Sequence, residues 1–471
     1  MSLSNTIKSI QDIMRQDTGV DGDAQRISQL VWMLFLKIYD DHEKELEMLD
    51  EKYKSPIPKN LRWREWAEND EGITGDGLLK FINNDLFEGL KGLSTTGKQG
   101  ERAKLVKDIF EDSYNYMKSG NLIRQVINKI NEMDFTKSSD RHVFNDIYEK
   151  ILKDLQSAGN SGEIYTPRPL TEFMTEMVNP KLGEKVLDIA SGTGGFLVST
   201  IEHIKRNGGE DSLENRQILQ NTVIGFEKKP LPHSLATTNL ILHGIEIPKV
   251  IRGNTLGKAL KEYSDKDYVD VVLTNPPFGG IEEDNISKSF STSFQTKETA
   301  DMFMLLVIEI LRDGGRAAIV LPDGFLFGEG VKTRIKERLL EKCNLHTIVR
   351  LPNGVFSPYT GITTNLLFFT KGEKTKDIWY FEHPYPEGTK SYSKTRPIQV
   401  SEFQLEKKWW NKRKENDYAW KVSVKDLKNF NLDIKNPNGK KEEEILDRSH
   451  ILSRMKENQN EISKLLKELS V

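Results

Sequence analysis

The sequence is poor in the features that mark secreted, membrane or cysteine-rich proteins. Its 471 residues include one cysteine, Cys343, so no internal disulfide or cysteine-based metal cluster can form. The longest apolar run, Met302 to Leu311, contains Glu309 and is too short to cross a bilayer. The N-terminus has no basic stretch followed by an apolar core, as a secretory signal would. We therefore expect a cytoplasmic protein with no metal site and no membrane contact.

The sequence also lacks an excess of positive charge. Lysine and arginine number 68 against 71 acidic residues, which gives a net charge of −3. A protein that binds DNA unaided is usually basic. Either nucleic acid is not the substrate, or a partner supplies much of the phosphate contact. The apolar fraction of 37% and the charged fraction of 30% are typical of a globular protein, and the length predicts two or three domains.

A five-residue segment, Thr274-Asn275-Pro276-Pro277-Phe278, follows an apolar run that begins at Val269. A short apolar run that ends in two prolines indicates a buried parallel strand that stops abruptly. Ligands of open α/β sheets bind at the carboxyl ends of such strands. We therefore expect this segment to lie where the chemistry takes place.

The side chains of this segment suit the binding of a planar amine. Asn275 offers an amide oxygen that accepts a hydrogen bond without ionising. Pro276 and Pro277 make the turn stiff and aim its carbonyls outward. Phe278 offers a flat face on which a base can stack, worth roughly 1–3 kcal/mol. Two acceptors on one amino group would expose its nitrogen lone pair. The alternative is a plain strand-ending turn with a core phenylalanine.

A glycine loop lies earlier in the chain, between a predicted strand over 186–189 and a predicted helix over 197–206. Its sequence is Ala-Ser-Gly-Thr-Gly-Gly-Phe over 190–196. A strand, a glycine loop and a helix in this order indicate a nucleoside-type cofactor. The sixth position counted from Gly192 is Leu197 rather than glycine, so a dinucleotide pyrophosphate is disfavoured. Close backbone approach at Gly192 and Gly194 would suit an amino-acid moiety.

Polar residues at two further strand ends, and one segment before the loop, complete the candidate site. Glu227 ends a predicted strand over 222–227 and could bind both ribose hydroxyls of a cofactor, although a solvated glutamate is equally expected. Asn254 follows a third strand and could meet an adenine edge or simply form a turn. In the segment Gly-Glu-Ile-Tyr-Thr-Pro-Arg over 162–168, Thr166 can cap a helix whose N-terminus, with Arg168, suits a carboxylate. An ordinary helix cap is the alternative.

The two ends of the chain show helical patterns. Residues 1–160 carry apolar side chains at helical spacing, such as Leu30, Leu34 and Ile38, and Val143 to Leu155 continue the pattern. Residues 401–471 are rich in lysine and glutamate, and an apolar seam from Ile445 to Leu469 predicts a terminal helix that needs a partner. Packing back on its own domain is the alternative. The polar stretch 279–299 is either a substrate-contacting loop or disordered.

The glycine loop, the acidic strand end and the Asn-Pro-Pro-Phe turn, in this order, resemble an S-adenosylmethionine-dependent DNA adenine-N6 methyltransferase. More closely, the chain resembles the modification (M) subunit of type I restriction–modification systems over nearly its whole length. The resemblance implies an α/β Rossmann-like methyltransferase domain over 161–400, an all-helical N-terminal domain over 1–160, and a C-terminal helical tail over 401–471. Two departures are an Ala-Ser pair before the glycines, where an aromatic residue is frequent, and Asn254 in place of a frequent aspartate.

The resemblance also implies roles for residues and partners. Asn275, Pro276, Pro277 and Phe278 would be catalytic and would hold an adenine flipped out of duplex DNA. The residues that would bind the cofactor S-adenosyl-L-methionine are Glu163, Ile164, Tyr165, Thr166, Pro167, Arg168, Asp188, Ser191, Gly192, Thr193, Gly194, Glu227 and Asn254. A specificity (S) subunit, with two M per S, would read the DNA sequence, and a restriction (R) subunit would cut. This division of labour fits the low positive charge.

Other readings of the same residues stay open at this point. A methyltransferase that acts on a glutamine side chain of a protein, or on RNA, would also need to hold an amine. A nucleotide-binding module without catalysis is a reading from another class. An NAD enzyme is disfavoured by Leu197 in the glycine loop.

Overall fold

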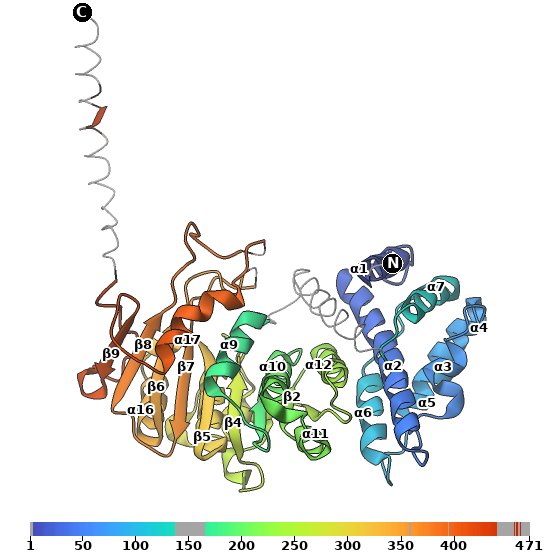
Figure 1. Cartoon of the computed structure of the whole chain (residues 1–471), viewed down its shortest axis with the longest axis horizontal. Coiled ribbons are helices and arrows are strands. Elements are labelled where there is room, and N and C mark those ends of the chain that lie inside the picture. Colours follow the sequence, from blue (N-terminus) through green and yellow to red (C-terminus); the bar gives the residue numbers. More distant parts are fainter. Residues whose placement is uncertain are drawn as a thin grey trace, which may run out of the picture.

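The computed structural model describes residues 3–136, 165–357, 359–393 and 395–439, together with residues 456, 458, 459 and 462. An N-terminal group of helices, blue in Figure 1, lies beside a larger part built on one sheet. The helices of the first group are α1 (Leu3–Met14), α2 (Asp23–Leu49), α3 (Trp63–Trp66), α4 (Gly75–Lys80), α5 (Phe87–Lys91), α6 (Gly100–Glu111) and α7 (Gly120–Asn131).

The N-terminal helices enclose a core of their own. Leu30, Leu34 and Ile38 on α2 are buried, as their helical spacing predicts. The proline- and tryptophan-rich segment 54–74 is held in place by the guanidinium of Arg124, which donates to the backbone carbonyls of four residues in it. The part of the expected helical pattern from Val143 to Leu155 lies outside the described residues.

The second part contains a nine-stranded sheet in the order β3-β2-β1-β4-β5-β7-β6-β8-β9. Its strands are β1 (Val186–Asp188), β2 (Val223–Glu227), β3 (Val250–Arg252), β4 (Val269–Thr274), β5 (Leu311–Pro322), β6 (Cys343–Arg350), β7 (Thr364–Lys371), β8 (Asp377–Glu382) and β9 (Ala419–Ser423). The five strands from β3 to β5 pair in parallel, while β7 runs antiparallel between β5 and β6. The predicted α/β class is confirmed.

Helices cover both faces of this sheet, as a parallel sheet requires. Along β4, Val271 and Leu273 belong to one core and Val272 to the other, because successive side chains point to opposite faces. Residues of α9, α10, α12 and α17 fill the first core, and residues of α14 and α16 fill the second. The helices of this part are α9 (Arg168–Val178), α10 (Gly195–Ile204), α11 (Leu213–Leu219), α12 (Pro230–Leu242), α13 (Asp284–Ser287), α14 (Thr299–Ile310), α15 (Asp323–Phe327), α16 (Val331–Lys342) and α17 (Gln404–Trp410).

The sheet is longer than the sequence patterns indicated. Two strands, β8 and β9, follow the last predicted strand, and β9 pairs with β8 at the edge of the same sheet. The sheet therefore continues past residue 400, where we expected the methyltransferase domain to end. The sequence patterns missed the last strand because it lies in a segment rich in lysine and glutamate. Its apolar contact is visible only in the structure, where Trp420 of β9 stacks on Tyr380 of β8 with ring centroids 5.2 Å apart. The seam from Ile445 to Leu469 lies outside the described residues apart from Ile462.

The two parts touch through α2, α6 and α12. Helix α12 packs on α2, and Leu235, Ile241 and Leu242 of α12 belong to the N-terminal core. Arg102 on α6 forms an ion pair with Glu246 at 2.6 Å, and Arg252 at the end of β3 pairs with Asp112. None of the helices in the described ranges is both long and apolar enough to span a membrane.

Candidate active site

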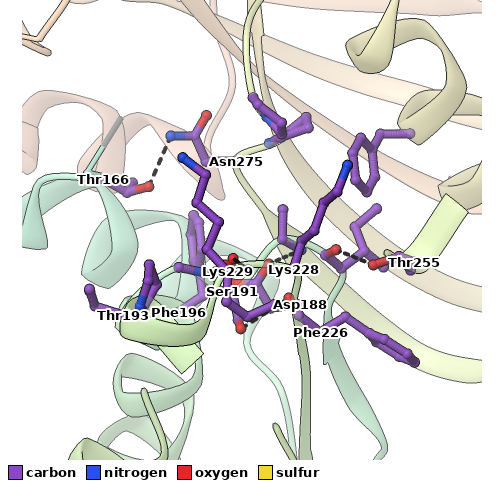
Figure 2. A pocket seen from close by; sticks show the side chains of 18 of the residues that line it. Thr166, Asp188, Ser191, Thr193, Phe196, Phe226, Lys228, Lys229, Thr255 and Asn275 are labelled. Atoms are coloured by element: carbon purple, nitrogen blue, oxygen red, sulfur yellow. Dashed lines mark hydrogen bonds between the residues drawn. The ribbon is translucent and has the colours of Figure 1, made fainter. Parts of the chain in front are cut away.

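A pocket with a cavity volume of about 210 Å³ lies at the carboxyl edge of the parallel strands. Because β1 to β4 are parallel, their carboxyl ends meet along this edge, and each contributes its following loop. Figure 2 shows these loops converging on one space. The lining residues are Tyr165, Thr166, 188–193, Gly195, Phe196, 226–229, Pro232, 253–255, 275–277, Glu282 and Phe303.

Asn275, which directly follows β4, lines this pocket and carries an unpaired hydrogen-bond acceptor. Its amide nitrogen Nδ2 donates to the hydroxyl Oγ1 of Thr166 at 2.9 Å (Figure 2). Its amide oxygen Oδ1 is buried and has no hydrogen-bond partner within the described residues. A buried acceptor without a partner costs about 1–3 kcal/mol. A ligand N–H that enters the pocket would remove this cost.

The glycine loop leaves open space where a cofactor would lie. Gly192 has φ +52, and a Cβ built on it would meet no atom within 4 Å. Gly194, with φ +83, caps α10 and approaches Ala236. Both positions favour glycine, because side chains strain the left-handed region. The backbone of the loop at Gly192 therefore faces the pocket directly.

Glu227 at the end of β2 is fixed by two backbone donors. One carboxylate oxygen accepts from the N–H of Gly192 at 2.9 Å, and the other accepts from the N–H of Lys229 at 2.7 Å. Each oxygen has a second lone pair, so the carboxylate can still accept from ligand hydroxyls. This arrangement suits the expected contact with a ribose.

Asp188 at the end of β1 is a buried carboxyl beneath the loop. Its Oδ1 accepts from the hydroxyl of Thr274 at 2.8 Å and from the N–H of Ala190 at 3.1 Å. Burial raises the pKa of Asp188 to about 7, while those two hydrogen bonds act in the opposite direction. Asp188 thus ties the tip of β1 to the residue before Asn275.

Asn254, after β3, uses its amide to organise the far end of the pocket. Its oxygen accepts from the N–H of Leu256 at 3.1 Å, and its nitrogen donates to Glu282 at 2.9 Å. Glu282 and Lys228 also line the pocket, and sequence reasoning missed both. No periodicity or motif singles out Glu282, because it reaches the pocket from the patternless stretch after Phe278.

Other predicted residues lie outside the lining. Arg168 forms ion pairs with Glu172 at 3.1 Å and Glu202 at 2.5 Å, and neither Arg168 nor Pro167 or Gly194 lines the pocket. The helix that begins at Arg168 therefore directs its guanidinium toward α10. Glu163 and Ile164 lie outside the described residues.

Phe278 is half-buried just beyond the pocket. Its ring and that of Phe356 form a T-shaped pair, with centroids 6.0 Å apart and planes at 83°. The structure thus brings together 11 of the predicted residues in one lining, with Phe278 beside them: Tyr165, Thr166, Asp188, Ser191, Gly192, Thr193, Glu227, Asn254, Asn275, Pro276 and Pro277.

Comparison with known proteins shows which family the chain matches. The N-6 DNA Methylase family model matches residues 139–445, and the HsdM N-terminal domain matches residues 3–130. The type I restriction enzyme EcoEI methylase subunit of Escherichia coli is 59% identical over 447 residues, 93% of this chain and 91% of that protein.

The chain belongs to the methylase subunits of type I restriction enzymes. The EcoKI methylase subunit of Escherichia coli strain K12 is 32% identical over 76% of this chain and 66% of its own length. A modification subunit of a putative type I restriction enzyme from Vibrio vulnificus YJ016 superposes with a TM-score of 0.85 at 44% identity, covering 93% of this chain and 97% of that one.

Membership of this family confirms the reading of the sequence as a DNA methyltransferase of the adenine-N6 class. The chain is the methylating subunit of a type I restriction–modification system. A second solved structure, described as the basis of complex assembly and conformational transition of the type I system, superposes with a TM-score of 0.83 at 36% identity over the whole chain. The readings as a protein-glutamine or RNA methyltransferase, a binding module or an NAD enzyme are thereby set aside.

Proposed function

We propose that the pocket binds S-adenosyl-L-methionine and that Asn275 holds the N6 amine of a target adenine at one end of it. The observation that carries the proposal is that Asn275 lines the pocket and that its buried amide oxygen has no hydrogen-bond partner among the described residues. An exocyclic amine supplies the N–H that this oxygen needs.

The pocket residues fit the cofactor in the order of the strands. Ser191, Gly192 and Thr193 at β1 would contact its methionine part, Glu227 at β2 its ribose, and Asn254 at β3 its adenine ring. The open side of Gly192 leaves room for that contact. When bound, the cofactor supplies an electrophilic methyl group on a sulfonium. We do not assign Arg168 to the methionine carboxylate, since its guanidinium is paired with Glu172 and Glu202.

The protein contributes position and hydrogen bonds at the target amine. The Asn275 oxygen and the carbonyl of Pro276 would accept from its two N–H groups and direct the nitrogen lone pair toward the methyl group. Thr166 keeps the nitrogen of the Asn275 amide away from the amine by accepting from it. Phe278 would stack on the flipped base, which offsets part of the few kcal/mol that flipping costs.

An Asn275→Ala variant tests this function. It should lose methyl transfer to duplex DNA by roughly 100-fold or more, as when one preorganised polar contact to a reacting group is removed. The affinity for S-adenosylhomocysteine should stay unchanged, because the proposed contacts from the loops after β1, β2 and β3 remain. The rate is measured as labelled-methyl transfer by the chain copurified with its neighbouring subunits. The affinity for S-adenosylhomocysteine is measured by calorimetric titration. The matched control is Asn84→Ala, an exposed position in the N-terminal part. Equal activity of Asn275→Ala and wild type would refute the proposal.

We also propose that the chain acts on duplex DNA within a complex. This complex would contain two copies of the chain for each specificity subunit, together with a restriction subunit. The support is family membership together with the net charge of −3, which leaves phosphate contacts to a partner. The proposed regions are a helical one to about residue 160, a methyltransferase one from 161, and a tail after β9 that binds the specificity subunit.

A further inference from the structure

The strand order fixes which part of the cofactor lies at each end of the pocket. Asn275 follows β4, Asn254 follows β3, and β1 and β2 lie between them. Neighbouring strands are about 4.8 Å apart, so these two ends are separated by roughly 14 Å. With Asn275 at the methyl end and Glu227 at the ribose, the purine ring falls at the Asn254 end. This placement rests on the proposed function.

Asn254 does not turn its oxygen toward a purine amine. The oxygen caps a short turn at Thr255–Gly257 by accepting from Leu256, and the amide nitrogen donates to Glu282. One lone pair of the Asn254 oxygen is therefore used within the turn. A carboxylate beside it would be a stronger acceptor for a purine amine than an amide oxygen.

Glu282 is an acceptor held at this end. Its carboxylate accepts from the Asn254 amide at 2.9 Å, and the ammonium of Lys228 lies 3.7 Å from the same oxygen. The side chain is 11% exposed. Its backbone is pinned, because the N–H of Glu282 donates to the carbonyl of Lys297 at 3.1 Å and Ile281 forms a β-bridge with Glu298. The stretch after Phe278 thus returns from the β4 end to the β3 end and carries a fixed carboxylate there.

We propose that Glu282 accepts a hydrogen bond from the 6-amino group of the cofactor's purine and makes the pocket select a 6-amino purine over a 6-oxo purine. The Asn254 N–H groups beside it would face the ring nitrogen N1, which is an acceptor in adenine. A 6-oxo purine reverses both groups: it carries an acceptor at position 6 and an N–H at N1. A carboxylate, which only accepts, would then face an oxygen.

Two nucleosides that differ at position 6 test this proposal by binding. We would titrate the full chain with S-adenosylhomocysteine and with S-inosylhomocysteine by calorimetry. The wild type should prefer the adenosyl compound by about tenfold or more, the range expected when a buried polar group loses its partner. In Glu282→Gln, the new amide oxygen would accept from Asn254 and its NH2 would face position 6. At position 6 this variant would match the inosyl compound, while the Asn254 N–H would still match only the N1 of the adenosyl compound, so the wild-type preference should fall to near parity.

Two further variants separate recognition from a purely structural role. Glu283→Gln changes the exposed neighbour in the same way and should keep the wild-type ratio. Glu282→Asp keeps a carboxylate and should keep the wild-type direction of preference, so it tests the proposal even where Glu282→Gln does not fold. If Glu282→Gln lowers both affinities and leaves their ratio unchanged, Glu282 only anchors the loop and the proposal is wrong. If the wild type binds neither nucleoside, the proposed function of the pocket fails and this proposal with it.

Discussion

Replacing Thr166 by valine removes the hydroxyl that accepts a hydrogen bond from Asn275, the residue that we propose holds the target amine. Thr166 Oγ1 accepts from Asn275 Nδ2 at 2.9 Å, and valine has the same shape without the acceptor. The Asn275 residue is 9% exposed, so water has little access to its freed N–H group. The family resemblance implies that Thr166 contacts the cofactor, whereas we propose from this hydrogen bond that it positions Asn275.

The size of the effect follows from the group that is left unpaired. A buried donor without a partner costs about 1–3 kcal/mol. The amide can relieve this cost by rotating its nitrogen toward the pocket, which withdraws the oxygen from the target amine. A loss of 1–3 kcal/mol of transition-state stabilisation lowers the methylation rate by about 5- to 150-fold.

A single-turnover assay of methyl transfer to duplex DNA measures this rate at saturating cofactor. Thr166→Val should be slower by the factor given above, with the Kd for S-adenosylhomocysteine unchanged, and Thr166→Ser, which restores the hydroxyl, should recover most of the rate. If Thr166→Val methylates at the wild-type rate, or if only its cofactor affinity falls, Thr166 does not act through Asn275.

Three further predictions concern other parts of the chain. Asp188 has its pKa raised by burial from 3.8 to about 7, so the folded state binds more protons than the unfolded state in this range. The free energy of unfolding should therefore fall as pH rises from about 4 to 8. Urea unfolding at pH 4 and pH 8 should show a smaller fall for Asp188→Asn than for the wild type. An equal fall in the two proteins would contradict this. Arg168→Ala should lower the unfolding temperature through its lost pairs with Glu172 and Glu202 and leave cofactor Kd unchanged; a large loss of affinity would place Arg168 at the cofactor after all. Truncation after Gly439 should preserve cofactor binding but abolish copurification with the specificity subunit and DNA methylation; a truncated chain that still assembles would show that the tail is not the binding segment.

Much of the methyltransferase core could be predicted because local sequence and strand order act together there. The run before Asn275 is apolar at every position that faces either core, and the proline pair ends it where the strand ends. Parallel pairing then brings the loops after β1, β2, β3 and β4 to one edge, so residues far apart in sequence meet without any further information.

The features that were missed depend on tertiary contacts that leave no local pattern. Glu282 reaches the Asn254 end of the pocket because a β-bridge between Ile281 and Glu298 folds the loop back, and no spacing reveals such a bridge. A helix follows the 162–168 segment as predicted, but the predicted cap by Thr166 is wrong: Pro167 is the N-cap and the Thr166 hydroxyl accepts from Asn275 instead. The partners that take up the charge of Arg168 lie on its own helix and on α10. Strand β9 could not be predicted because it lies in a charged segment. Its contact with the core, made by side chains such as the buried Trp420, is visible only in the structure.

We propose that a methyl donor lies in this pocket with its reactive end beside the amide of Asn275. The most direct measurement is a crystal structure of the chain with sinefungin, in which an amine replaces the sulfonium methyl. We predict that this amine lies within about 4 Å of the Asn275 side chain and that the ribose hydroxyls contact Glu227. A ligand bound away from these strand ends, or an Asn275 oxygen turned into the protein core, would contradict the account.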